Sequence, residues 1–502
     1  MWRASILSIA AMATLPCVDA ITLHKRDEPA VLGLPVSRSE RSQALQKRDS
    51  KTVSTSLYNV QNMYYMVNIT VGTPPQNLSL SLDTGSSDIW VNLPNSTYCE
   101  GDDDPCSSTG LFNIKKSSSF EMLDYVMNAT YASGFLAYGH YATDTLSIGG
   151  AKLKDMEFAV AETSLNPHGI LGIGYSSATV AAMKFDKKYK NLPEALVESG
   201  AIKSPAYSLW LNKFDGTGNL LFGGVNKARY QGELQTVPVL KVYDRYLSLA
   251  IALTDISIKS SKETNSYSTG LPLAVSLDNG SPLITLPKEL VDPIYKEVGA
   301  GYSEKAKWPY IPCKMSEADY NVTFSFSGAK VTMPLSELVF DNYSADGFAE
   351  DDCIFGISYS EEGVNLMGDP FLRGAYVVYD LGNNEISLAN TDFDGGDDDI
   401  HEIGTGIAAV PDATAVPSPV TSATGNGPLP TTGTEYVSGS GSSQTTYYVA
   451  SGTTGDATGT ATGTATKGAA TSTSSDGLAA FPTSKPNRLL SGVLGAGMLL
   501  AL

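Results

Sequence analysis

Cysteine and histidine are scarce in this chain of 502 residues, which contains five cysteines and four histidines. No two cysteines have the Cys-x-x-Cys spacing of common zinc sites, so we expect no metal and no other cofactor. His140 and His168 stand in no recognisable nucleophile–base motif, which disfavours catalysis through an activated serine or cysteine.

Basic residues are also in short supply, because 34 Lys and Arg face 53 Asp and Glu, for a formal net charge of −19. Such a charge argues against nucleic acids and anionic membrane surfaces as partners. It suits a chain that must stay soluble in acid, where many carboxylates become neutral.

The N-terminal apolar run, at residues 6–15, is short; it follows Arg3 and precedes a small residue, Ala20. This pattern predicts a secretory signal peptide over residues 1–20, since a membrane-spanning helix needs about 20 apolar residues. Two Lys-Arg pairs follow, and they predict a propeptide over residues 21–48 that is cut after Arg48. The alternative is an ordinary charged tail.

Large aliphatic side chains almost disappear after residue 400, where Ser, Thr, Gly, Ala and Pro dominate. Residues 401–475 therefore predict a disordered, O-glycosylated stalk. A short polar spacer and an apolar tail at 489–502 then resemble a glycosylphosphatidylinositol (GPI) signal, with attachment at Ser475 and removal of residues 476–502. A tail-anchored helix is the alternative. The expected location is the secretory pathway, then the cell membrane or wall, with the anchor as the membrane contact.

Four cysteines remain once Cys17 leaves with the signal peptide, and four cysteines allow three pairings. In a secreted chain disulfides are expected. The tight spacing of Cys99 and Cys106 favours a small local loop, which leaves Cys313 to pair with Cys353.

Short alternating or β-branched runs, separated by Gly, Pro, Asn and Asp, fill the chain between about residues 59 and 390. Helical patterns are sparse, and the best candidates are residues 192–199 and 288–298, each followed by glycine. The body is therefore expected to be all-β with a few short helices.

Two segments of this body echo each other, residues 80–86 (LSLDTGS) and 275–281 (VSLDNGS). Each is followed, at nearly the same distance, by two apolar residues and a glycine, at 170–172 and 366–368. The echo predicts two lobes of similar topology, residues 49–235 and 236–400. Each lobe would contribute one aspartate.

Asp83 and Asp278 are the candidate catalytic residues, since an apolar strand delivers each one to a turn. Gly85 lets the backbone pass close behind the carboxylate, and Ser86 can donate a hydrogen bond to it. Gly280 and Ser281 repeat these parts in the second turn. Two adjoining carboxylates cannot both ionise easily, so they can share a proton and activate a water.

Residues 83–90 (DTGSSDIW) resemble the first catalytic motif of the pepsin-like aspartic proteases, and residues 71–76 resemble the turn before it. The echo motifs and Tyr379-Asp380-Leu381 are similar too, over about residues 58–390. The stalk and tail are most similar to the fungal yapsin-like branch. The resemblance implies a bilobal pepsin-like fold and a monomeric endopeptidase that cleaves peptides and proteins in acid.

The resemblance also implies a flap hairpin, with Tyr131 near its tip, followed by Ser133 and Gly134, and a bond from Tyr131 to Trp90. Thr84 would hold the two turns together with a hydroxyl partner, but this chain has Asn279 at the partner position. That departure leaves a catalytically impaired binding or structural protein of the wall as the main alternative. A glycan-binding wall protein is a third reading.

Acidic residues at 102–104 lie inside the expected Cys99–Cys106 loop and would favour basic substrate side chains if they bordered the active site. A solvated acidic loop is equally expected. Asn-x-Ser/Thr sequons predict N-glycosylation, except at Asn279 beside the candidate aspartate; the predicted sites are Asn68, Asn77, Asn95, Asn128, Asn321 and Asn342.

Overall fold

A computed structural model describes residues 30–38, 64–100, 105–131, 136–214, 217–242, 244–341, 347–360, 363–425 and 500–501. Several predictions therefore lie outside the described residues: the signal peptide, the cut after Arg48, most of the stalk, the attachment residue Ser475, the acidic loop 102–104, and Ser133, Gly134 and Asn342. No described helix is long and apolar enough to cross a membrane.

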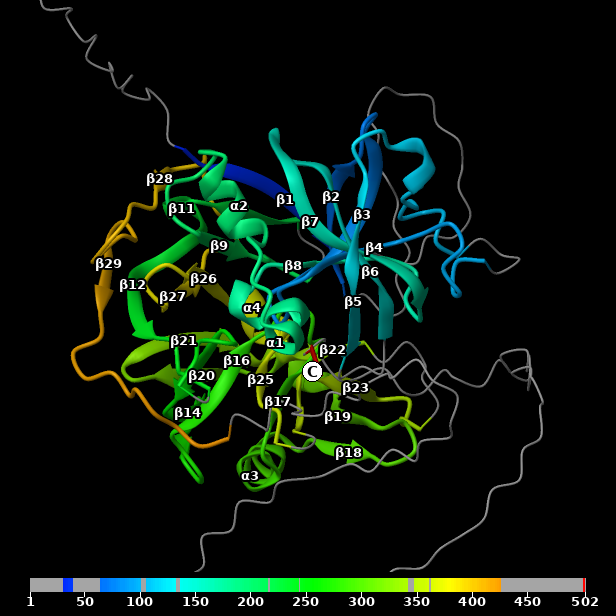
Figure 1. Cartoon of the computed structure of the whole chain (residues 1–502). Helices are drawn as coiled ribbons and strands as arrows, with labels where there is room; N and C mark the ends of the chain where they lie inside the picture. The colour runs from blue at the N-terminus through cyan, green and yellow to red at the C-terminus, as the bar shows by residue number, and fades with distance from the viewer. Residues whose placement is uncertain are drawn as a thin grey trace, which may run out of the picture.

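A single sheet of fifteen strands runs through the molecule and joins its two halves (Figure 1). In spatial order its strands are β29 (Ala413–Ala415), β12 (Tyr230–Pro238), β27 (Glu385–Thr391), β26 (Ala375–Asp380), β9 (Ala206–Trp210), β10 (Thr217–Phe222), β1 (Leu32–Arg38), β2 (Tyr65–Val71), β3 (Gln76–Asp83), β8 (Ile170–Gly172), β4 (Ile89–Asn92), β7 (Ala151–Ser164), β6 (Leu136–Ile148), β5 (Glu121–Tyr131) and β30 (Leu500–Ala501).

The second half of the chain adds three smaller sheets, which lie in the lower part of Figure 1. One has five strands, β13 (Ala250–Leu253), β16 (Leu273–Leu277), β25 (Leu366–Met367), β17 (Ile284–Leu286) and β24 (Ile357–Tyr359). Two have four strands each, β15 (Thr264–Tyr267), β14 (Asp255–Ser260), β20 (Tyr320–Phe326) and β21 (Ala329–Pro334), and β18 (Gly301–Ser303), β19 (Trp308–Pro312), β23 (Asp352–Phe355) and β22 (Val339–Phe340). Apart from these sheets, β11 (Gly224–Asn226) and β28 (Ile400–Glu402) form a two-stranded pair at the upper left of Figure 1.

Short helices complete the described part: α1 (Val180–Phe185), α2 (Leu192–Glu198), α3 (Lys288–Val298) and α4 (Asp369–Gly374). The two predicted helices are present as α2 and α3. Helix α3 ends where predicted because Gly299 adopts the left-handed conformation, with φ 69°, that closes a helix without strain. The fold is the expected all-β, bilobal, pepsin-like architecture with few short helices.

The two segments that repeat in the sequence also have the same strand pairing in the two lobes. In the first lobe β3 pairs in parallel with β8, so that Asp83 lies opposite Gly172. In the second lobe β16 pairs in parallel with β25, and Leu277 lies opposite Met367. Each predicted apolar-apolar-Gly motif therefore flanks the strand that leads to an aspartate.

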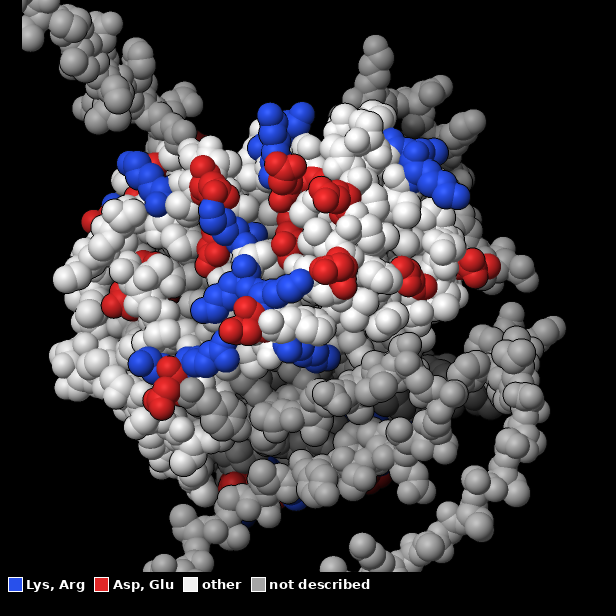
Figure 2. Space-filling model, in the orientation of Figure 1, with Lys and Arg blue, Asp and Glu red and all other residues white. Residues whose placement is uncertain are grey.

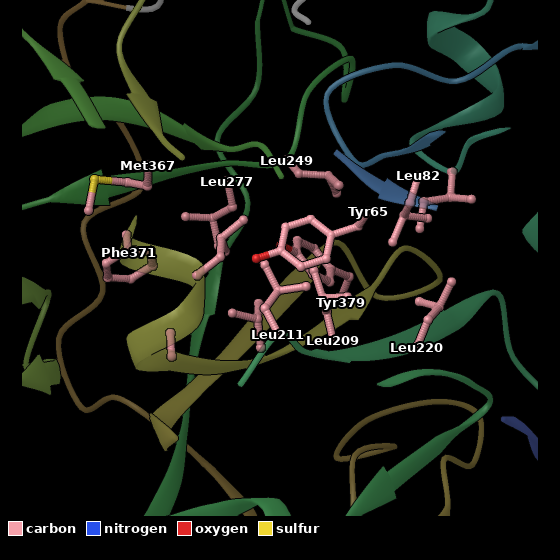
Figure 3. Close-up of a cluster of buried hydrophobic side chains, with 14 of the residues drawn as sticks. Tyr65, Leu82, Leu209, Leu211, Leu220, Leu249, Leu277, Met367, Phe371 and Tyr379 are labelled. Carbon is pink, nitrogen blue, oxygen red and sulfur yellow. The ribbon is translucent and has the colours of Figure 1, made fainter. Parts of the chain in front are cut away.

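The apolar core lies directly beneath these strand ends. Leu82 and Leu277, the residues before the two aspartates, are fully buried in one continuous cluster. Figure 3 shows them around Tyr65 and Tyr379, together with leucines from β9, β10 and neighbouring segments. Burial of this cluster fixes the ends of β3 and β16 relative to one another.

Two segments pack more closely than their composition predicts. Residues 32–38, inside the expected propeptide, form β1 between β10 and β2, and Leu32 and Leu34 are buried in the core. The predicted disordered stalk does not begin at residue 401, because the chain stays packed to Gly425. There β29 pairs with β12, and Val410 and Val416 are buried against the body. A few aliphatic residues among many small ones supply that burial.

Both predicted disulfides are present, Cys99–Cys106 and Cys313–Cys353.

Among the described sequons, the Asn side chains at 68, 77 and 95 are exposed and those at 128 and 321 are partly buried. Asn279, by contrast, is only 1% exposed. On the face shown in Figure 2, basic side chains lie among acidic ones.

Candidate active site

The first turn holds Asp83 through its own backbone and a neighbouring hydroxyl. Asp83 ends β3 and is fully buried. The Gly85 N–H donates to Asp83 Oδ1 at 2.8 Å, and the Ser86 hydroxyl donates to Oδ2. This is the arrangement that the sequence predicts for a carboxylate held in a tight turn.

The second turn repeats the backbone contact but not the hydroxyl contact. The Gly280 N–H donates to Asp278 Oδ1 at 2.8 Å, and Asp278 is fully buried. The expected donation from Ser281 to the carboxylate is wrong, because its hydroxyl donates instead to the Leu283 carbonyl at 2.9 Å. Among the described residues no donor reaches Asp278 Oδ2.

The two carboxyl groups meet at the junction of the lobes. A Cβ on Gly85 would lie 2.6 Å from Asp278 Cγ and 2.7 Å from either carboxylate oxygen. Only a glycine at this position lets the first turn lie against the second carboxyl group. The absence of a side chain at Gly85 therefore permits the predicted close approach of Asp83 and Asp278.

Thr84 and Asn279 lock the two turns together with four hydrogen bonds across the junction. The Thr84 hydroxyl donates to the Leu277 carbonyl and accepts from the Asn279 N–H, both at 3.0 Å. The Asn279 amide accepts from the Thr84 N–H at 2.8 Å and donates to the Leu82 carbonyl at 2.9 Å. The Asn side chain thus supplies both a donor and an acceptor across the junction.

Each turn also packs on the glycine of its flanking motif. A Cβ on Gly172 would lie 2.6 Å from the Asp88 carbonyl oxygen, and a Cβ on Gly368 would lie 2.2 Å from the Leu283 carbonyl oxygen. The backbone after each aspartate therefore passes against a neighbouring strand at a distance that only glycine permits.

Burial raises the pKa of Asp83 well above its usual range, and the neighbouring Asp278 carboxylate raises it further. The hydrogen bonds from Ser86 and Gly85 act in the opposite direction. Burial likewise raises the pKa of Asp278, and the Gly280 N–H opposes this rise. Two desolvated acids side by side hold a proton at a pH at which exposed aspartates are ionised.

Tyr131 ends β5 and is buried, and the Trp90 indole N–H donates to its hydroxyl at 2.8 Å. The sequence predicted a contact between these two residues, and the structure brings them together. Strands β5 and β6 form the antiparallel hairpin expected here, with Thr130 opposite Leu136.

The sequence assigns no role to Asp88 within the motif at residues 83–90, yet Asp88 is 1% exposed and accepts hydrogen bonds from Tyr141 and Tyr189. The available signal was a charged residue directly before an apolar strand, since buried carboxylates are rare unless paired. Asp369 was missed too. It accepts from Tyr65 of the other lobe and pairs with the buried Arg373.

Two lobes that each deliver a buried aspartate to a shared junction define the pepsin-like class of aspartic proteases. Residues 64–391 match the model of the eukaryotic aspartyl protease family, and the chain belongs to that family.

The relatives agree with this assignment. The chain is 44% identical to the probable aspartic-type endopeptidase opsB of Aspergillus oryzae, over 85% of this chain and 90% of the relative. It is 44% identical to the protein of the same name in Aspergillus fumigatus, over 81% and 86%. It is 32% identical to aspartic proteinase yapsin-3 of Saccharomyces cerevisiae, over 82% of each chain. The chain is therefore an aspartic-type endopeptidase of the yapsin-like branch, and its substrates are peptides.

Proposed function

We propose that Asp83 and Asp278 hydrolyse peptide bonds in acid by activating one shared water. The observation that carries the proposal is the contact between the Asp278 carboxyl group and the Asp83 turn, at Gly85. The ionised member of the pair takes a proton from the water, which attacks the peptide carbonyl. The protonated member gives its proton to the carbonyl oxygen. As the C–N bond breaks, the first carboxyl group passes the proton of the water to the leaving amine, and the second takes its proton back from the new carboxyl group.

The raised pKa values of both carboxyl groups support activity in acid. The pair needs one proton, and burial together with mutual repulsion keeps that proton bound above the usual range of an aspartate. Activity is therefore expected through the acid range and lost as the pH rises and the last proton leaves.

In this proposal Tyr131, at the end of β5 in the hairpin, contacts the bound peptide, and its hydrogen bond with Trp90 fixes the position of its hydroxyl. The hairpin tip, with Ser133 and Gly134, would cover the bound peptide and exclude water. Thr84 and Asn279 hold the dyad geometry, and the four hydrogen bonds that they make across the junction favour an active dyad over the binding-only alternative.

The decisive experiment compares peptide hydrolysis in acid by the secreted chain with that by Asp83→Asn and Asp278→Asn. Each variant removes one titrating carboxyl group and keeps a similar shape. We expect each to lose activity by at least about 10³-fold, since both carboxyl groups act as a unit. Equal rates for all three proteins would refute the proposal. Peptides with and without Lys or Arg at the scissile bond would test the preference suggested by residues 102–104.

We further propose a secreted, surface-anchored, N-glycosylated monomer with a signal peptide over residues 1–20, a propeptide over residues 21–48 and a GPI anchor at Ser475. The apolar run, the Lys-Arg pairs and the Ser/Thr-rich segment with its tail support this route. Sequencing of the mature N-terminus should find residue 49. Phospholipase C should release the enzyme from membranes, and a Ser475 variant should appear in the medium. Retention after phospholipase treatment would argue for a tail-anchored helix.

A further inference from the structure

Asp88 is a buried carboxylate that the proposed hydrolysis does not use. Its Oδ1 accepts from the Tyr141 hydroxyl at 2.7 Å and from the Tyr189 hydroxyl at 2.6 Å. Its Oδ2 accepts from the Val180 N–H, at the start of α1, at 2.8 Å. All three neighbours are donors that point at the carboxylate, so this site is built for an acceptor with two oxygens.

The backbone of Asp88 is tied to the strand that flanks the first catalytic candidate. The Gly172 N–H donates to the Asp88 carbonyl at 3.0 Å, and Gly172 lies opposite Asp83 in the β3–β8 pair. A movement of Asp88 would therefore disturb the strand on which the Asp83 turn rests.

The segment from Asp88 to Trp90 contacts both strands of the hairpin, β6 through Asp88 and β5 through Trp90. Tyr141 lies on β6, its ring stacks on Tyr125 of β5 with centroids 4.7 Å apart, and its hydroxyl also accepts from the Ala181 N–H at 3.1 Å. Two residues after Asp88, Trp90 donates to Tyr131 at the end of β5. The segment from Asp88 to Trp90 thus holds β5 at one point and β6 at another.

We propose that Asp88 is a positioning residue that fixes the β5–β6 hairpin relative to the Asp83 turn and thereby sets how tightly a peptide is held. The inference rests on the proposed function, because it assigns the hairpin to the substrate. The corresponding residue after Asp278 is Leu283, which packs with Trp308 in a small apolar cluster. The carboxylate is therefore a feature of the lobe that carries the hairpin.

Asp144 provides a matched control in the same lobe. It is also 1% exposed and lies on β6. It accepts from the hydroxyls of Ser117 at 2.7 Å and Ser119 at 2.6 Å, and from the Thr145 N–H at 2.7 Å. Asp144→Asn and Asp88→Asn thus replace a carboxyl group by an amide at equally buried sites with three donors, but only Asp88 holds the dyad turn to the hairpin.

The experiment measures kcat, KM and melting temperature for the secreted full chain and its Asp88→Asn and Asp144→Asn variants, with a quenched peptide in acid. Both variants should melt at lower temperature. Asp88→Asn should raise KM by about tenfold and change kcat by less than about threefold. Asp144→Asn should leave both constants within about twofold of wild type. Equal KM values for the two variants would overturn the proposal, since KM, unlike the apparent kcat, does not depend on the fraction of the enzyme that is folded.

Tyr141→Phe is the second variant, and it decides the matter if Asp88→Asn does not fold. It keeps the carboxylate but cuts the link to the hairpin, so KM should rise as in Asp88→Asn. The double variant should be no worse than Asp88→Asn alone, since the two residues act in one contact. A KM for Tyr141→Phe within twofold of wild type would overturn the proposal. A wild-type protein without activity would instead overturn the proposed function, and this inference with it.

Discussion

The two turns that carry Asp83 and Asp278 share a backbone but differ in their support. Each aspartate follows a buried strand and accepts the N–H of the glycine two residues on, at 2.8 Å in both cases. Only Asp83 has an additional hydroxyl donor, because Ser86 turns toward it while Ser281 turns away. The repeated sequence fixes the shape of the site, and the unequal neighbours make its two acids chemically different.

That difference matters because, in a pair that shares one proton, the neighbouring groups decide which carboxyl group is protonated and which is ionised. The Ser86 hydroxyl stabilises the ionised form of Asp83. The Ser281 hydroxyl gives Asp278 no such help, and Ser281 opposes the rise in the pKa of Asp278 through its backbone N–H alone. The first lobe also adds the Asp88 carboxylate and the hairpin, whereas the second places Leu283 in an apolar cluster. Substitutions that remove or exchange these unequal parts should therefore affect the two lobes differently.

The largest effect is expected where the two turns are joined. Asn279→Ala leaves the Thr84 N–H and the Leu82 carbonyl buried without partners, which costs about 2–4 kcal/mol of unfolding free energy. Because the dyad geometry depends on this junction, kcat/KM should fall by about 10³-fold. Denaturant unfolding and peptide hydrolysis measure the two losses.

Asn279→Thr sharpens the same comparison, since a threonine hydroxyl can also donate to Leu82 and accept from Thr84. This variant should keep activity within about tenfold of wild type. Activity as low as in Asn279→Ala would show that the amide itself is required.

The sequence predicted the all-β class, the two aspartates and both disulfides because these depend on local patterns or on a repeat within the chain. The compatibility of Asn279 could not be predicted, since it depends on distances between the Leu82 and Leu277 carbonyls of different lobes. The rotamer of Ser281 likewise depends on where the Leu283 carbonyl lies. Strand β1 and the packed residues up to Gly425 were missed because their few apolar residues show no clear period, and tertiary pairing alone gives these segments their strands and their burial.

Each lobe contains one disulfide, so the contributions of the two disulfides to stability can be compared without changing the two aspartates. Cys99–Cys106 spans a sequence separation of 7 residues, and Cys313–Cys353 a separation of 40. The longer loop loses more chain entropy when closed, so replacing Cys313 and Cys353 by Ala should cost about 4 kcal/mol against about 2.5 kcal/mol for the shorter loop. Urea unfolding of the two double variants tests the order, and a larger loss for the shorter loop would contradict it.

His168 should make the stability of the first lobe depend on pH in a way that the second lobe does not share. It is 2% exposed before β8, where the second lobe has Val364 before β25. Burial lowers the pKa of His168 to about 4. Between pH 6.5 and 4 the unfolded chain takes up this proton and the folded chain does not, so unfolding becomes easier as pH falls, by about 3 kcal/mol once pH is below 4.

His168→Val should remove that penalty and make the first lobe resemble the second. Unfolding free energies of variant and wild type, measured from pH 7 to pH 4, should diverge in favour of the variant as the pH falls. The packing of His168 against Tyr64 contributes equally at both ends of the range, so only the slope counts. Parallel curves would mean that His168 is protonated at the same pH in both states.

The smallest effect is expected from the serines that distinguish the two turns. The Ser86 hydroxyl lowers the pKa of Asp83, so Ser86→Ala should raise that pKa further and move the pH profile of kcat/KM to higher pH, with a loss of about tenfold at the optimum. Ser281→Ala removes only the bond to the Leu283 carbonyl, so it should cost about 1 kcal/mol of stability and leave the profile in place. If both variants moved the profile equally, the hydroxyls would support the two carboxyl groups alike, and the chemical difference between the turns would have to arise elsewhere.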